Sequence, residues 1–185
     1  AIGYDLYCRM LESAIKEKRG IKVAEDTSCE IDMSIDAFIP AEFIMNETQK
    51  LDIYKRIAEI KNDEDADEMR DELKDRFGSI PQEAENLLKI ALLKAKAGKY
   101  HITSIHGKDG VLNFKMDRKA PAEVTEIPVL LNSYGGDMRL KTVGDPVFSL
   151  SLRESGGLYG SALMLKKADE TLDSFGILFP ERSDS

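Results

Sequence analysis

The chain has 185 residues, of which 42% are hydrophobic and 32% charged, a balance typical of a globular protein rather than a disordered one. No apolar run approaches the roughly 20 residues that cross a bilayer, and no signal peptide is visible, so we expect no membrane association. The formal net charge of −8 repels phosphate backbones and predicts no direct contact with nucleic acid.

The first segment, residues 1–18, has the apolar spacing of an amphipathic helix. The polar stretch 20–28 follows and is the predicted domain boundary. Because the chain begins with Ala1 and a helical pattern starts at once, we expect a piece of a longer protein. Residues 30–36 then alternate strictly between apolar and polar side chains, which predicts a strand with one buried and one solvated face.

Three helices are predicted next, over residues 48–60, 65–77 and 81–97, and the third is the most apolar. The corner before the third helix combines Phe77, Gly78, Ser79 and Pro81. Glycine suits the left-handed backbone that ends many helices, serine is a frequent N-cap, and proline suits a first helical turn. The spacing therefore predicts a tight turn between two helices.

After Gly98 the pattern favours hairpins, the first pairing residues 101–106 with 111–116 and the second pairing 138–143 with 147–152. A short helix over 121–133 and a closing amphipathic helix over 158–175 complete the prediction. The predicted fold class is α+β: a helical half of three consecutive helices, then β-hairpins and helices, with an appended N-terminal helix.

Residues that carry chemistry are sparse. The phosphate-binding pattern G-x-x-x-x-G-K-[ST] is absent, and Gly156-Gly157 follows no βαβ unit, which favours a plain turn. His101 and His106 are five residues apart on a predicted strand, hence on opposite faces. Cys8 and Cys29 lack a metal-binding spacing. The sequence therefore predicts no catalytic residue, no cofactor and no metal site.

The most distinctive stretch is acidic. Nine carboxylates stand between Glu59 and Asp75, against three basic residues. No glycine marks the sharp bend that a calcium loop needs. The pattern favours a solvated helix face, and the functional alternative is an acidic surface for docking a basic partner.

Several stretches together resemble the C-terminal domain of bacterial transcription-repair coupling factors. The matching stretches are Ile2-Gly3-Tyr4-Asp5-Leu6-Tyr7, Met10-Leu11, Glu30-Ile31-Asp32, Ala37-Phe38-Ile39-Pro40, Phe43-Ile44, Gln49-Lys50-Leu51-Asp52-Ile53-Tyr54-Lys55-Arg56-Ile57-Ala58, Asp75-Arg76-Phe77-Gly78, Pro81 and Asn86-Leu87-Leu88. They cover residues 2–95, and the resemblance places residues 1–28 at the end of a translocase motor and residues 29–185 in the C-terminal domain.

What this resemblance implies is a regulatory part of a cytoplasmic, ATP-driven DNA translocase. The parent protein displaces stalled RNA polymerase and recruits UvrA, a component of nucleotide excision repair. Its C-terminal domain has no catalytic residues; it packs on the UvrB-like N-terminal module, covers the UvrA-binding surface and restrains the motor. The expected partner is thus intramolecular, with UvrA and RNA polymerase reached only through the full-length protein.

We expect four acidic residues to contribute to docking on the UvrB-like module: Glu64, Asp67, Glu68 and Asp71. The competing hypothesis is a self-standing interaction module that contacts RNA polymerase or DNA through the hairpin half. A small basic cluster there, Lys108, Lys115, Arg118 and Lys119, is its only support.

Overall fold

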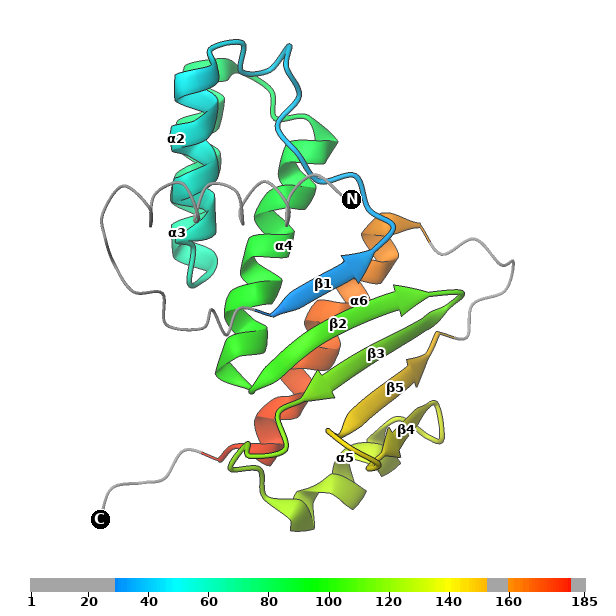
Figure 1. The fold of residues 1–185 in the computed structure, drawn as a ribbon. Coiled ribbons are helices and arrows are strands. Elements are labelled where there is room, and N and C mark those ends of the chain that lie inside the picture. The colour runs from blue at the N-terminus through cyan, green and yellow to red at the C-terminus, as the bar shows by residue number, and fades with distance from the viewer. Residues whose placement is uncertain (1–28, 153–159, 181–185) are drawn as a thin grey trace, which may run out of the picture. The chain divides into compact units, whose positions relative to one another are not determined.

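The computed structural model describes residues 29–152 and 160–180 (Figure 1). Four predicted features lie outside the described residues: the helix over residues 1–18, the connector after it, the turn at Gly156-Gly157 and the tail after residue 180. Cys8 and the predicted boundary at residue 28 lie outside them too.

The fold combines helices with a five-stranded sheet, which confirms the predicted α+β class. The helices are α2 (Glu47–Ala58), α3 (Asp63–Phe77), α4 (Gln82–Lys99), α5 (Ile127–Ser133) and α6 (Ser161–Ser174), the strands are β1 (Glu30–Met33), β2 (Ile102–Lys108), β3 (Val111–Met116), β4 (Met138–Lys141) and β5 (Val147–Ser151), and the 3-10 turns are η1 (Val124–Glu126) and η2 (Phe175–Leu178). Each helix and hairpin predicted within the described part of the chain is present, and most bounds shift by at most three residues. The helix predicted over 121–133 is the exception, because it is α-helical only from Ile127, after the 3-10 turn η1.

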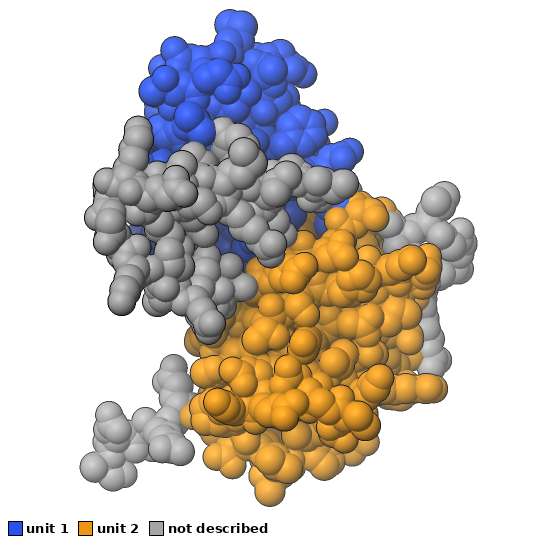
Figure 2. Space-filling view, viewed as in Figure 1, with its two compact units in different colours: residues 1–27, 35–95 blue, residues 28–34, 96–185 orange. Residues whose placement is uncertain are grey.

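The chain divides into two compact units, coloured blue and orange in Figure 2. Unit 1 comprises residues 1–27 and 35–95, and unit 2 comprises residues 28–34 and 96–185. Strand β1 therefore belongs with the later strands, and not with the helices that follow it directly in sequence. The predicted separation of a helical half from a hairpin half holds for the remaining described elements.

The core of unit 1 is formed by one apolar stripe from each of its three helices. The fully buried members are Ile53 and Ile57 of α2, Ala66 and Leu73 of α3, and Leu87 and Leu88 of α4, each at most 1% exposed. The spacing is four residues in α2 and seven in α3, and in α4 the equally buried Ala84 lies three residues before Leu87 and four before Leu88. This is the spacing of an amphipathic helix, so burial of this stripe holds the helices together.

The segment before α2 is fixed to the helices of unit 1 by hydrogen bonds. The Tyr54 hydroxyl accepts from the Ile39 backbone N–H at 2.8 Å, and the amide of buried Asn86 donates to the Asp36 carbonyl at 2.9 Å. Ile39 and Ile44 are buried, so this loop packs into unit 1 through apolar side chains as well. Phe38, by contrast, is 41% exposed and contributes less to this packing.

Unit 2 is built on a five-stranded sheet with the order β1-β2-β3-β5-β4. β1 pairs in parallel with β2, and the other neighbours are antiparallel. Asp109 and Gly110 have φ of 50° and 74°, so they form the two-residue turn with positive φ at both positions that matches strand twist in a tight hairpin.

One face of the sheet is apolar and is covered by α6 and η2; α6 passes behind β2 and β3 in Figure 1. The ring of Phe175 packs edge-on against Phe114 at 5.5 Å and Phe148 at 5.0 Å between centroids. Gly107 of β2 leaves room for Met164 of α6, because a Cβ at position 107 would lie 2.5 Å from the Met164 Cε atom. The opposite face of the sheet is polar.

Across the described residues, none of the helices combines the length and the apolar character that a membrane span requires.

Candidate functional site

Helix α3 carries the predicted docking residues, and local hydrogen bonds define where it begins. The side chain of Asn62 accepts from the Asp65 N–H at 2.8 Å, and the Asp65 carboxylate accepts in return from the Lys61 N–H at 2.8 Å. This reciprocal cap satisfies two backbone donors at the start of the helix. Gly78, with φ of 87°, ends the helix as predicted, and its N–H donates to the Lys74 carbonyl at 3.0 Å.

All four predicted docking residues lie on one exposed face of α3. Their spacing of i, i+3, i+4 and i+7 places them on the side opposite the buried residues Ala66, Met69 and Leu73. Asp75, at i+11, extends the same face and is exposed. We call this set the acidic stripe; it consists of Glu64, Asp67, Glu68, Asp71 and Asp75.

The acidic stripe is largely without internal partners. Asp67 accepts from the Arg70 Nη1 atom at 2.5 Å, with 71% of its side chain still exposed. Glu64, Glu68 and Asp71 make no ion pair within residues 29–152 and 160–180. Their charges are therefore available to a partner, and no internal contact must be broken to use them.

Glu72, a carboxylate of α3 outside the acidic stripe, joins α3 to α2 through hydrogen bonds. It accepts hydrogen bonds from both Nη atoms of Arg56, one of them at 2.6 Å, and from the Arg76 Nη1 atom at 2.7 Å. These hydrogen bonds, from Arg56 first and Arg76 second, lower the pKa of Glu72 to about 2. Glu72 is thus an internal structural residue, and the acidic stripe is held in a fixed direction.

Arg70 makes the matching connection between α3 and α4. Its Nε donates to the Glu85 carboxylate at 2.6 Å, while its Nη1 bonds Asp67. Burial of the Arg70 guanidinium lowers its pKa, but the hydrogen bonds that it donates to Glu85 and Asp67 outweigh this, and the net pKa is raised. Arg70 stays charged and joins the acidic stripe to the next helix.

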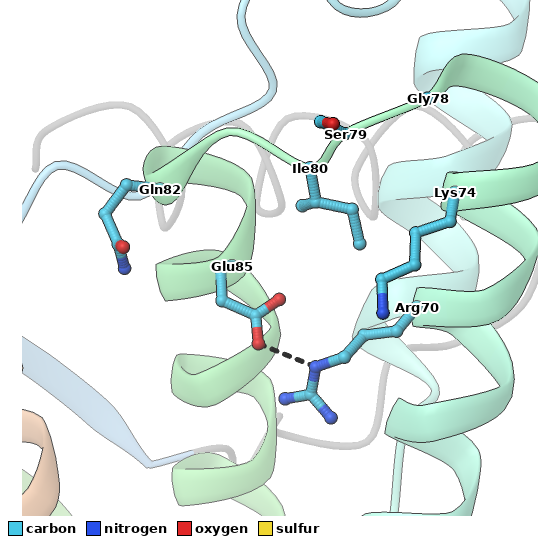
Figure 3. Close-up of a pocket in the computed structure, with 7 residues that line it drawn as sticks. All are labelled: Arg70, Lys74, Gly78, Ser79, Ile80, Gln82 and Glu85. Carbon is cyan, nitrogen blue, oxygen red and sulfur yellow. Dashed lines mark hydrogen bonds and ion pairs between the residues drawn. The ribbon is translucent and has the colours of Figure 1, made fainter.

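A shallow hollow of about 560 Å³ opens at the corner between α3 and α4 (Figure 3). It is lined by Arg70, Lys74, Gly78, Ser79, Ile80, Gln82 and Glu85. Figure 3 shows the Lys74 side chain reaching into the hollow, above the Arg70–Glu85 pair. Lys74 has no ion-pair partner among the described residues, so the hollow offers one ammonium group beside the acidic stripe.

The corner itself differs from the prediction in two details. Helix α4 begins at Gln82, and the Pro81 carbonyl accepts from the Glu85 N–H at 3.0 Å, so Pro81 rather than Ser79 holds the N-cap position. Phe77 packs on Phe43, with ring centroids 5.8 Å apart, and Arg76 lies over the Phe77 ring. The second difference is the Arg70–Glu85 pair, which joins α3 to α4 and could not be predicted without knowledge of the fold.

Other residues singled out by the sequence are not brought together. His101 lies just before β2 with φ of 55°, and His106 on β2 meets Asp32 of β1 at 2.9 Å. Within the part of the chain that the structure describes, no three His, Cys, Asp or Glu side chains are grouped as a metal site would need. Of the predicted basic cluster, Lys115 and Arg118 share Asp145, at 3.6 and 2.9 Å.

Comparisons with known proteins identify relatives of this chain. A family model described as "TRCF domain" matches residues 33–127. The "Transcription-repair-coupling factor" of Staphylococcus haemolyticus (strain JCSC1435) is 38% identical over 126 residues, 67% of this chain and 11% of the relative. That of Bacillus subtilis (strain 168) is 32% identical over 177 residues, 94% of this chain and 14% of the relative. The chain thus spans about a seventh or less of the length of these relatives.

A solved structure shows the same fold. The "Crystal structure of C-terminal domain of transcription-repair coupling factor" superposes with a TM-score of 0.69 at 21% sequence identity. The match covers 82% of this chain and 94% of that one, so the likeness extends well beyond residues 33–127 into the hairpin half.

Proposed function

Because this chain belongs to the TRCF domain family, we propose that it is the non-catalytic regulatory domain of an ATP-driven DNA translocase that couples transcription to nucleotide excision repair. In this proposal residues 29–185 form the regulatory domain, and residues 1–28 belong to the end of the motor. The protein works in the cytoplasm, and the domain meets UvrA and RNA polymerase only through the full-length protein.

The proposed action is an autoinhibitory clamp. The domain docks on the UvrB-like N-terminal module of the same protein, masks the UvrA-binding surface and restrains the motor. A clamp of this kind needs to bias a two-state equilibrium by only about 1–3 kcal/mol, the usual size of an allosteric coupling. Exposed ion pairs can supply that amount, and salt screens them, so the clamp can open without unfolding.

The observation that carries the proposal is the acidic stripe on α3. Glu64, Glu68 and Asp71 are exposed and have no ion-pair partner in the described part of the chain. The Glu72 and Arg70 hydrogen bonds fix the helix behind them, so little ordering cost remains when a basic surface docks. A stripe that served stability alone would be expected to pair with the chain's own cations, as Glu72 does.

The proposal is tested by binding of the 185-residue chain to the separate UvrB-like module at low and high salt. Glu64→Lys with Glu68→Lys should weaken binding about 5- to 150-fold at low salt, a range set by the coupling size above. Glu42→Lys with Asp52→Lys is the matched control, because both residues are exposed acids of unit 1 outside the stripe. Equal loss in both variants would point to net charge alone.

A second readout uses the full-length protein. Reversal of Glu64, Asp67, Glu68 and Asp71 should raise its basal ATPase rate and its binding of UvrA together. Values unchanged from wild type in both assays would refute the docking assignment.

A further inference from the structure

The face of the unit 2 sheet opposite α6 and η2 carries an ordered set of polar side chains. The cross-strand register defines two adjacent rows on this face, Glu30–Ser104–Lys115–Val147–Lys141 and Asp32–His106–Asn113–Ser149–Arg139. Only Val147 among these ten is apolar. Side chains two residues apart share a face, so the rows lie about 7 Å apart and neighbouring strands about 5 Å apart.

Charge is separated along both rows. Glu30 and Asp32 stand on β1, at one edge of the sheet, while Lys141 and Arg139 stand on β4, at the other. Both β4 cations are exposed and make no ion pair among the described residues. Asp32 is already paired with His106, whereas Lys115 shares Asp145 with Arg118. Uncompensated positive charge thus gathers on the β4 side, in a chain whose net charge is negative.

Hydrogen-bonding groups lie between these cations. The Ser149 hydroxyl donates to the Asn113 side-chain oxygen at 2.5 Å, and among the described residues the Asn113 amide N–H groups and a lone pair of Ser149 have no further hydrogen bond. Arginine, lysine, serine and asparagine are the side chains that contact phosphate oxygens in protein–DNA complexes. We define the basic sheet surface as the five residues Arg139, Lys141, Lys115, Asn113 and Ser149.

Against the expectation from the net charge of −8, we propose that the basic sheet surface binds the phosphate backbone of duplex DNA without reading its base sequence. None of the five residues of the basic sheet surface is aromatic, so the surface offers no platform on which single-stranded bases could stack. It also lacks the apolar anchors that form the centre of a protein interface, since half-buried Val147 is its one apolar residue in the two rows. Binding of a polyanion such as duplex DNA requires neither a stacking platform nor apolar anchors.

The acidic residues limit where DNA lies. Glu30 and Asp32 repel phosphates from the β1 edge, so the backbone is confined to strands β3, β5 and β4. The distance from β3 to β4, two strand spacings or about 10 Å, holds a short stretch of one backbone. Contact with about three phosphates is expected, and the affinity is correspondingly modest and sensitive to salt. This inference concerns unit 2 and does not rest on docking by the acidic stripe.

Fluorescence anisotropy of a labelled 20-base-pair duplex, titrated with the 185-residue chain between 20 and 150 mM NaCl, tests the proposal. Binding should be measurable at 20 mM NaCl, with a slope of log K against log salt of about −2.7 for three phosphates. Arg139→Gln with Lys141→Gln should weaken binding at 20 mM at least tenfold and make the slope shallower by about 1.8. Lack of binding by the wild-type chain at 20 mM NaCl would overturn the proposal.

The matched control is Lys166→Gln with Lys167→Gln, which makes the same charge change on α6, at the covered side of the sheet. It should leave both affinity and slope unchanged; a loss equal to that of the β4 variant would mean that only net charge matters. Polyglutamate at equal charge is the competitor. If it displaces the duplex as well as unlabelled duplex does, the surface takes acidic protein instead and the DNA proposal fails. Thermal unfolding of every variant verifies that the fold is retained.

Discussion

The Glu72 carboxylate accepts two hydrogen bonds from the Arg56 guanidinium, so side chains 16 residues apart join α3 to α2. Paired hydrogen bonds between a carboxylate and a guanidinium constrain direction as well as distance. The pair thereby fixes which side of α3 faces α2, and with it the direction of the acidic stripe.

Glu72→Gln should lower the free energy of unfolding by about 1 kcal/mol, because it removes the charge from a partly exposed bidentate pair. Urea denaturation measures the change. Glu68→Gln is the matched control, since Glu68 lies on the same helix without an ion pair in the described residues, and it should change stability by less than about 0.5 kcal/mol. Equal effects of the two substitutions would contradict the structural role of Glu72.

The same pair predicts a pH dependence of stability. The pKa of Glu72 is lowered to about 2 from an ordinary value of 4.5, so its contribution is complete above pH 4.5 and is lost as the pH falls toward 2. The stability difference between wild type and Glu72→Gln should be constant from pH 7 to 5 and shrink steadily below pH 4.5. Urea denaturation at pH 7, 5, 4 and 3 measures it, and a difference that grows on acidification would contradict the assignment.

Two glycines, Gly78 at the end of α3 and Gly98 within α4, should respond in opposite ways to replacement by alanine. Gly78 has φ of 87°, where a Cβ is strained although no neighbouring atom lies within 4 Å, so Gly78→Ala should cost about 1 kcal/mol. Gly98 lies within α4, without positive φ and with open space around it, so Gly98→Ala should stabilise by up to about 1 kcal/mol. Thermal unfolding of the two variants measures both signs, and a shared sign would contradict this reading.

Removal of the buried Asn86 amide should destabilise unit 1. Asn86 is 3% exposed, and its amide donates to the Asp36 carbonyl, so Asn86→Ala removes this partly buried hydrogen bond at a cost of about 1 kcal/mol. Gln49→Ala is the control, because Gln49 is an exposed residue of unit 1 whose side chain makes no hydrogen bond among the described residues. Chemical denaturation should show a small effect for Gln49→Ala, and an effect as large as that of Asn86→Ala would place the stabilisation elsewhere.

Apolar spacing was sufficient to predict much of this structure. Ala66, Met69 and Leu73 recur at helical intervals, so the acidic stripe opposite them followed from the sequence without knowledge of a partner. The same reasoning could not separate Glu72 from Glu68. Both are carboxylates of one helix, and only the packing of α2 beside α3 brings Arg56 to one and not to the other.

Long-range pairing was the part that periodicity could not predict. The alternation of residues 30–36 indicated a strand, but not that it pairs in parallel with β2 or that Asp32 meets His106. Likewise the two hairpins were predicted separately, and the β3–β5 pairing that places β4 at the sheet edge appeared only in the fold. The two rows on the polar face therefore have no signature in the linear sequence.

The parallel pairing of β1 with β2 makes the described residues of unit 1 an insertion within the connectivity of unit 2. During synthesis β1 must wait for residues 35–95 to emerge before its partner strand exists, although closing so long a loop costs only slightly more than closing a short one. A chain shortened to begin at Lys96 would keep four of the five strands and leave β2 as a bare edge, open to pairing with other chains. Unit 2 is thus compact in space yet cannot be excised as one continuous piece of sequence.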